Sequence, residues 1–182
     1  MTDQAYDALE DRLKELDPSN PFLKNMNDDV NFQQEVKLPV ILGSQNKALT
    51  LSDLDPFINK VSNNPLHCSM KLDGMSCLLI YKAGKLVQAS TRGNGFIGLD
   101  ITKVAKCISS IPQTLPEPID CMARGEITIS KADLVKLQAE QAKNGEEPYK
   151  NTRNGAVAIV KTPDNAKYYK YLDFHAYDFW QN

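Results

Sequence analysis

The chain has 182 residues, of which 42% are hydrophobic and 24% are charged, and its formal net charge at pH 7 is −2. This length can bury one good core with at most a small appendage. The near-neutral charge argues against a surface that holds a nucleic-acid backbone alone, since phosphate binding draws on clustered Lys and Arg. If DNA is the substrate, its basic binding surface is local or is supplied by a partner.

Residues 2–17 predict an amphipathic helix, because apolar side chains recur from Tyr6 to Leu16 at three- and four-residue spacing. Thr2 or Asp3 can cap its start, and an Asp-Pro pair ends it. The first residues are polar and do not resemble a signal peptide, and no apolar run is long enough for a membrane span.

Residues 18–37 contain Pro, Asn and Asp without a sustained period and predict a linker. A short apolar run at 38–42 then meets a polar turn at 43–46, and residues 52–61 predict a short helix. From about residue 66 the hydrophobic period changes toward two, which indicates strands.

Two strand segments at 76–82 and 85–90 flank Ala83-Gly84 and predict a β-hairpin. Residues 122–129 predict a further strand, after which Ser130 is expected to cap a helix that runs to Asn144 and stops at a glycine.

A short helix is expected after Asn154, and the aromatic-rich residues 169–180 predict a closing strand. Strands interrupted by unlinked helices indicate an α+β domain with a mainly antiparallel sheet, rather than a doubly wound one.

The cysteines and histidines show no metal-ligand spacing and no CxxC pair. They are Cys68, Cys77, Cys107, Cys121, His67 and His175. This pattern predicts reduced thiols in a cytoplasmic protein rather than a zinc site.

Residues suited to chemistry first gather at 71–74, which read KLDG. A lysine amine attacks phosphorus only when unprotonated, so a catalytic Lys71 needs burial or a nearby cation to disfavour its charged form. Asp73 could orient water on a metal ion or bind a ribose hydroxyl, and Gly74 permits a tight turn and a close backbone approach. Taken alone, the segment is more typical of a β-turn with a surface lysine.

Two later segments suggest a phosphate or nucleotide site. Arg92 lies at a predicted strand end before several glycines, and arginine makes paired hydrogen bonds to phosphate or ribose oxygens. Glu126 interrupts an apolar strand, so its carboxylate needs a partner such as a metal-bound water, a hydroxyl or a lysine. Structural explanations also exist: a mobile glycine-rich hairpin for the first, and an ion pair of Glu126 with Arg124 or another cation for the second.

The order of these segments resembles the adenylation domain of NAD-dependent DNA ligases, over roughly residues 38–180. The matching segments are KxDG at 71–74, TRGxGxxGxD at 91–100, RGE at 124–126, an RN-containing segment at 151–154 and a closing strand at 172–177. The resemblance implies a mainly antiparallel sheet of the covalent nucleotidyltransferase (ATP-grasp-like ligase) type, with flanking helices and a short N-terminal helical cap.

The same resemblance implies a division of the chain. Residues 1–20 would be a partial helical cap that binds nicotinamide mononucleotide, 21–37 a linker, and 38–182 the N-terminal part of the adenylation domain. The cap residues that would contact nicotinamide mononucleotide are Asp3, Tyr6 and Asp7. Since ATP-dependent ligases lack this cap, the implied cofactor is NAD, although Tyr6 also fits the apolar stripe of the helix.

By this resemblance, Lys71 would attack the α-phosphate of NAD, become a lysyl-adenylate and pass AMP to a DNA 5′-phosphate during nick sealing. Mg²⁺ would spread the phosphate charge and help the lysine lose its proton. The implied catalytic residues are Lys71 and Asp73. The other implied cofactor-binding residues are Ser44, Gln45, Gly74, Arg92, Glu126, Arg153 and Lys161, and no direct metal ligand is assigned.

Several positions depart from the family pattern. Ser69 and Leu99 stand where the family has Glu, Asn94 replaces an Asp, and Lys161 replaces a second Arg. Lysine is a poor substitute wherever two parallel hydrogen bonds are needed. These changes affect adenine and phosphate contacts but leave the nucleophile intact.

The sequence lacks the family's downstream lysine motifs, its later domains and the first helix of its cap. It therefore resembles either a truncated protein or the natural first half of a ligase split over two polypeptides, as in some large phages, and its start and end favour the split. The expected partners are a second ligase subunit carrying the downstream lysine motifs and nicked DNA bound through the complex, with no membrane. A phage-encoded chain would act in the host-cell cytoplasm.

The aromatic residues near the end would contact that partner or form a core strand of this domain. They are Phe174, Tyr177, Phe179 and Trp180. Two other functions remain open: an ATP- or GTP-dependent nucleotidyltransferase of the RNA ligase or capping type, and a non-catalytic, ligase-derived nucleotide-binding regulatory protein.

Overall fold

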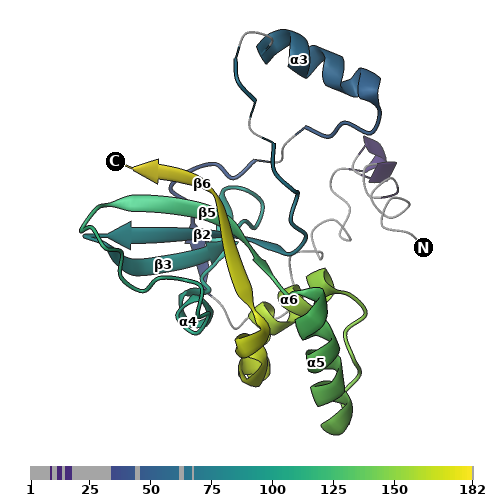
Figure 1. Ribbon diagram of the computed structural model, residues 1–182, viewed down its shortest axis with the longest axis vertical. Coiled ribbons are helices and arrows are strands. Elements are labelled where there is room, and N and C mark those ends of the chain that lie inside the picture. The colour runs from purple at the N-terminus through teal and green to yellow at the C-terminus, as the bar shows by residue number, and fades with distance from the viewer. Residues whose placement is uncertain are drawn as a thin grey trace. The chain divides into compact units, whose positions relative to one another are not determined.

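The computed structural model describes residues 9, 12–13, 15–17, 34–43, 46–61, 64–66 and 68–181. The chain divides into two compact units, Met1–Gln34 and Glu35–Asn182, and the elements labelled in Figure 1 belong to the second. In the first unit the described residues between Leu9 and Leu16 are helical and Asp17 is not, in agreement with the predicted helix and its end; the other residues of that helix lie outside the description. None of the described helices has the length and apolar character needed to span a bilayer.

Antiparallel sheets form the framework of the second unit. The strands are β1 (Glu35–Lys37), β2 (Met75–Lys82), β3 (Lys85–Thr91), β4 (Ile97–Leu99), β5 (Cys121–Thr128) and β6 (Asp173–Gln181). Four of them form one sheet in the order β3-β2-β5-β6, and β1 pairs with β4 in a separate ribbon. Every pairing is antiparallel, as predicted.

The predicted hairpin between β2 and β3 is confirmed, and its turn explains it. Ala83 and Gly84 have φ angles of 46° and 74°. Positive φ at both central residues matches the right-handed twist of the two flanking strands. The carboxylate of Asp120 supports the turn by accepting a 2.7 Å hydrogen bond from the backbone N–H of Ala83.

Helices cover one face of the four-stranded sheet and bury the main core there. They are α4 (Thr102–Ala105), α5 (Lys131–Lys143), α6 (Thr152–Lys161) and the 3-10 segment η2 (Pro163–Tyr171). Odd-numbered strand residues such as Cys77 and Ile127 point to this face, where they pack with Leu137, Ile159 and Tyr168. Figure 1 shows α5 and α6 beside one another at one end of the sheet.

Even-numbered residues of β2 and β5 face the opposite side of the sheet. Leu78 is buried there in a second apolar cluster with Leu38 and Leu42, and Met122 and Trp180 pack against it. The predicted apolar run at 38–42 therefore covers one end of this second face. The predicted helix at 52–61 is also confirmed, as the 3-10 segment η1 (Leu51–Leu54) followed by α3 (Asp55–Val61).

β6 changes the face that it presents at a bulge. Its register with β5 shifts beside Arg124, and Tyr177 is skipped in the pairing. Phe174, before the bulge, packs into the main core, whereas Trp180, after it, packs against the second cluster. Tyr177 and Phe179 are about half exposed, so the closing strand has both core positions and open ones.

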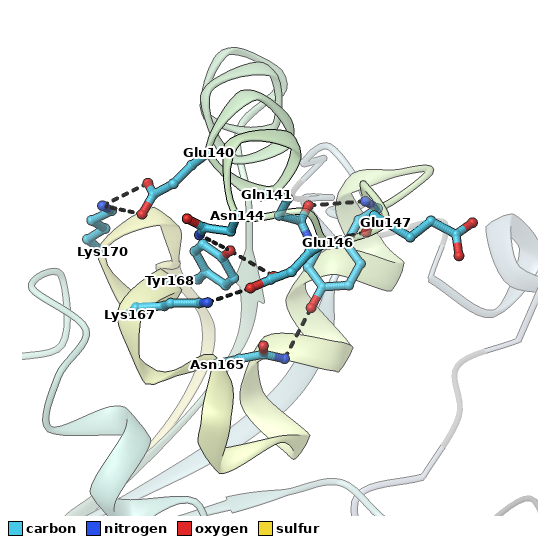
Figure 2. A network of polar contacts seen from close by, with 10 residues as sticks. Glu140, Gln141, Asn144, Glu146, Glu147, Asn165, Lys167, Tyr168 and Lys170 are labelled. Atoms are coloured by element: carbon cyan, nitrogen blue, oxygen red, sulfur yellow. Dashed lines mark hydrogen bonds and ion pairs between the residues drawn. The ribbon is translucent and has the colours of Figure 1, made fainter.

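A polar network fastens α5 to η2 (Figure 2). Glu140 accepts hydrogen bonds from Lys170 and Tyr171, at 3.1 and 2.6 Å. Glu146, just beyond α5, accepts from Lys167 and, at 2.8 Å, from the hydroxyl of the buried Tyr168. Because η2 leads directly into β6, this network fixes where the last strand begins.

Some element boundaries differ from the prediction. The closing strand begins at Asp173, because Tyr168 is fully buried in the main core and holds the preceding residues in η2. α6 begins at Thr152, before the expected start, because the side chain of Asn151 caps it by accepting from Asn154 N–H at 2.8 Å. The last three residues of the predicted linker, 35–37, form β1. β4 and α4 were not predicted.

Candidate active site

The segment 71–74 leads into β2 and lies directly against the end of β5. A Cβ atom on Gly74 would lie 2.1 Å from the backbone oxygen of Ile127, so this approach requires glycine. The backbone of Gly74 also hydrogen-bonds the carboxylate of Glu126. Glycine therefore brings the lysine-bearing segment alongside the one carboxylate of β5.

Glu126 is half-buried on the second face of the sheet, and burial raises the pKa of its carboxyl group. The positive charge of Lys71 acts most strongly in the opposite direction, followed by the hydrogen bond from Gly74 and the charge of Arg153. The negative charge of Asp73 raises the pKa further. Lys71, Asp73 and Arg153 are thus all close enough to act on one carboxyl proton.

Asp73 and Arg153 form an ion pair. The Asp73 Oδ1 and Arg153 Nη1 atoms are 3.6 Å apart, and both side chains are more than 60% exposed. Arg153 lies in the first turn of α6, which the Asn151 cap begins. An ion pair this exposed contributes little to stability, so the two charges stay available to a ligand.

Lys71 is exposed. A catalytic Lys71 needs either burial or a nearby cation to disfavour its charged form. The side chain is not buried in this structure, and the nearby cation remains a prediction. The lysine nevertheless lies near Glu126, since its charge acts on the Glu126 carboxyl group.

Arg92 is exposed immediately after β3, and its backbone N–H donates a 3.2 Å hydrogen bond to the carbonyl of Ser76. Ser76 faces Glu126 across the β2–β5 pairing. The backbone of Arg92 is therefore joined to the strand that faces the Glu126 carboxylate.

The glycine-rich segment after Arg92 is an ordered turn with a structural explanation. Gly93 and Gly95 have φ angles of 51° and 92°. The side-chain oxygen of Asn94 accepts from the backbone N–H groups of Phe96 and Ile97, at 3.0 and 2.9 Å. An amide oxygen can accept these two hydrogen bonds as a carboxylate would, so asparagine suits this position.

The other predicted site residues lie apart from this group or outside the described residues. Lys161 ends α6, about 12 Å along the helix axis from Arg153. The residues outside the description are Asp3, Tyr6, Asp7, Ser44 and Gln45.

Sequence reasoning missed the role of Arg124, which lies two residues from Glu126 on the same face of β5. Its Nη2 donates to the carbonyl of Gly43 at 3.3 Å, and its guanidinium carbon lies 5.6 Å from the centre of the Tyr177 ring. The Tyr177 hydroxyl is 3.0 Å from Ser76 Oγ. The charges that act on Glu126 come from other residues. The alternation of β5 could have placed Arg124 beside Glu126, but not against Gly43.

No group of three or more His, Cys, Asp or Glu side chains in the described ranges could hold a metal ion by itself. Asp73 and Glu126 do provide two carboxylates close together. Mg²⁺ is usually bound by one or two carboxylates, several waters and the phosphates of a substrate. The residues present therefore fit Mg²⁺ that binds together with a nucleotide.

A hollow of about 330 Å³ lies on the β1–β4 ribbon, away from these residues. Its lining residues are Glu35, Val36, Lys37, Phe96 and Ile97. None of the predicted site residues is among them, so the candidate active site is the group around Glu126.

Comparison of the amino-acid sequence with known proteins identifies a family. The family model of the NAD-dependent DNA ligase adenylation domain matches residues 31–182. A DNA ligase of Lactobacillus gasseri is 36% identical over 171 residues, which cover 89% of this chain and 26% of that protein. DNA ligases of Halothermothrix orenii and Aliarcobacter butzleri are 31% and 34% identical, with 98% and 100% of this chain covered. The chain spans 26 to 30% of the length of these relatives.

Proposed function

Because the chain belongs to the NAD-dependent DNA ligase adenylation domain family, we propose that Lys71 is the residue that NAD adenylates during nick sealing. The antiparallel sheet and its helical layer are compatible with the covalent nucleotidyltransferase (ATP-grasp-like ligase) fold, which we propose for residues 38–182. We also propose that residues 1–20 form the partial cap for nicotinamide mononucleotide and 21–37 the linker.

The observation that carries the proposal is the meeting of three distant segments at one carboxylate. Lys71 and Asp73 precede β2, Glu126 lies in β5 and Arg153 lies in α6, yet all three others act on the Glu126 carboxyl group. A surface turn with an incidental lysine does not require these residues to meet. They must meet in a site that binds a phosphate between cations and holds a metal ion on carboxylates.

In the proposed reaction the neutral amine of Lys71 attacks the phosphorus next to adenosine. A nitrogen–phosphorus bond forms, the bond from that phosphorus to the bridging oxygen breaks, and nicotinamide mononucleotide leaves with the electron pair; the amine proton goes to solvent. An oxygen of the DNA 5′-phosphate then bonds to the same phosphorus, the nitrogen–phosphorus bond breaks, and the Lys71 amine leaves with the electron pair and takes a proton from solvent. The adjacent 3′-hydroxyl finally displaces AMP and seals the nick.

The other residues bind and orient the nucleotide. Arg92 and Arg153 are placed to bind phosphate oxygens. Lys161, two turns along α6 from Arg153, would contribute a more distant positive charge. When bound by Asp73 and Glu126, Mg²⁺ would spread the phosphate charge and help Lys71 lose its proton. Gly74 keeps the segment against β5.

We further propose that the adenine side of NAD contacts Ser44 and Gln45, and that Asp3, Tyr6 and Asp7 bind the nicotinamide mononucleotide half. These assignments rest on the family resemblance alone, since all five residues lie outside the described ranges.

We propose that the downstream lysine motifs come from a second ligase subunit, and that nicked DNA is bound through the resulting complex. In the described part of the chain, β6 is an edge strand with exposed Tyr177 and Phe179, which would suit contact with that partner.

The test is to incubate the chain with NAD and Mg²⁺, with and without the remaining ligase segments, and to search for an AMP adduct on Lys71 by peptide mass spectrometry. Lys71→Arg should abolish the adduct, and Lys85→Arg, a substitution on β3, should not. If no adduct forms even with the remaining segments, the proposal is wrong.

Labelling from ATP or GTP instead of NAD, unaffected by Asp7→Ala, would indicate a different nucleotidyltransferase. Nucleotide binding without an adduct would indicate a regulatory protein.

A further inference from the structure

We propose that Arg124 is a positioning residue that holds the segment 38–43 on the second face of the sheet, where Glu126 of the candidate active site also lies, and so supports nucleotide binding there. The nucleotide part of this proposal rests on the proposed function. The anchoring part rests on contacts in the structure alone.

Hydrogen bonds and burial hold the segment 38–43 in place up to Leu42, but packing does not hold it at Gly43. Backbone N–H groups of Leu38 and Leu42 donate to the carbonyls of Phe96 and Gly95, at 2.8 and 3.0 Å, and both leucines are buried. At Gly43 the position of a Cβ atom has no heavy atom within 4 Å. The hydrogen bond from Arg124 to the Gly43 carbonyl therefore restrains the chain where side-chain packing ends.

The guanidinium group is itself oriented by two other strands. Its carbon lies 5.6 Å from the centre of the Tyr177 ring in β6, and the Tyr177 hydroxyl is 3.0 Å from Ser76 Oγ in β2. A planar guanidinium can stack on a ring while an N–H at its edge donates. Lysine has a single ammonium group and does not provide both contacts in one fixed geometry.

Arg124 is poorly explained as a stabilising residue. Its Nε atom is buried without a hydrogen-bond partner among the described residues, and a buried donor without an acceptor lowers stability. An apolar side chain of similar length would remove that cost. Stability and positioning should therefore respond differently to substitution.

The experiment compares Arg124→Met with Lys82→Met in the full chain. Lys82 lies in β2 and pairs with Asp120 at 3.0 Å, so this control removes a long cationic side chain that is not part of the candidate site. Hydrogen–deuterium exchange is measured for the peptide that begins at Leu38 and extends past Gly43. We expect exchange about tenfold faster in Arg124→Met, with an unchanged or higher Tm, and no change in Lys82→Met.

The functional readout is adenylation of Lys71 with the remaining ligase segments present. Loss of one charge-assisted contact that acts through position should raise the apparent KM for NAD roughly tenfold and change kcat less than about twofold. Arg124→Lys, which keeps the charge, should give an intermediate KM.

Unchanged exchange in Arg124→Met would overturn the anchoring, and faster exchange with an unchanged KM would overturn the link between segment 38–43 and nucleotide binding. A lower Tm with unchanged exchange would show a purely structural role and overturn the whole inference. If the wild-type chain forms no adenylate at all, the proposed function fails and the positioning part fails with it, but the exchange data still decide the anchoring.

Discussion

The Asp73 carboxylate lies 3.6 Å from the Arg153 guanidinium, and this ion pair joins the segment before β2 to the first turn of α6. Both partners are largely exposed, so the pair is poorly suited to stabilise the fold. It does place one anionic and one cationic group beside Glu126, where a metal-bound phosphate would need both.

Asp73→Asn and Arg153→Met should each separate stability from activity. We expect the free energy of unfolding to change by less than about 0.5 kcal/mol, as is usual for exposed pairs, while adenylation of Lys71 falls at least tenfold. Urea denaturation and adduct mass spectrometry measure the two quantities. Lys136→Met, which removes the exposed Lys136–Asp133 pair of α5, should change neither. A large loss of stability in the Asp73 or Arg153 variant would assign the pair a structural role.

Gly74→Ala should destabilise the protein by about 1–3 kcal/mol, the usual cost of forcing an extra methyl group into a packed position. The added Cβ would lie 2.1 Å from the backbone oxygen of Ile127, and backbone atoms cannot easily move aside. Gly43→Ala is the matched control, because the corresponding space there is open. Chemical denaturation of both variants checks this, and equal stabilities would contradict the close packing of segment 71–74.

The pKa of Glu126 predicts a pH dependence. Because this pKa is raised in the folded state, mainly by burial, the folded state binds the proton more tightly than the unfolded state. The contribution of Glu126 to the free energy of unfolding is therefore fully present below its pKa in the unfolded state, about 4.3. It is lost as pH rises through its raised pKa in the folded state. Between those limits, Tm of Glu126→Gln should rise relative to the wild type as pH increases. Parallel pH dependences of Tm in the two proteins would argue against this.

The cysteines should react in two classes. All four are free, with Cys68 and Cys107 exposed and Cys77 and Cys121 buried. Burial raises the pKa of both inner thiols, most strongly at Cys77, which further reduces their thiolate fraction. A thiol-specific reagent should therefore modify the first pair quickly and the second pair only on unfolding. Fast modification of Cys77 in the native protein would contradict the position of β2 in the core.

The sequence predicted the elements whose signals are local. The Ala83-Gly84 turn and the Ser130 cap act within a few residues, and both appear in the structure. β4 and α4 span only a few residues and depend on partners elsewhere in the chain, so no local pattern predicts them. Tyr169 and Tyr171 of η2 were predicted as strand from their strand propensity. Burial of the neighbouring Tyr168 and its hydrogen bond to Glu146 override that propensity.

The candidate site was predicted in part. Lys71, Asp73, Glu126 and Arg153 were identified from motif order, and the structure places them around one carboxylate. Whether they carry the chemistry remains a prediction. The contact of Arg124 with Gly43 could not be predicted, because it depends on how segment 38–43 packs across strands distant in sequence.

The bulge in β6 decides which face of the sheet each later residue of the strand presents. With one residue skipped at Tyr177, two even-numbered aromatic side chains, Phe174 and Trp180, reach opposite apolar clusters. Deleting Tyr177 would leave Ala176 opposite Gly125 and Trp180 opposite Met122, so the strand would return to simple alternation with Trp180 still on the second face. The margin of the sheet can therefore absorb the loss of this one residue without exchanging its inner and outer sides, at the cost of the contacts that the Tyr177 side chain makes.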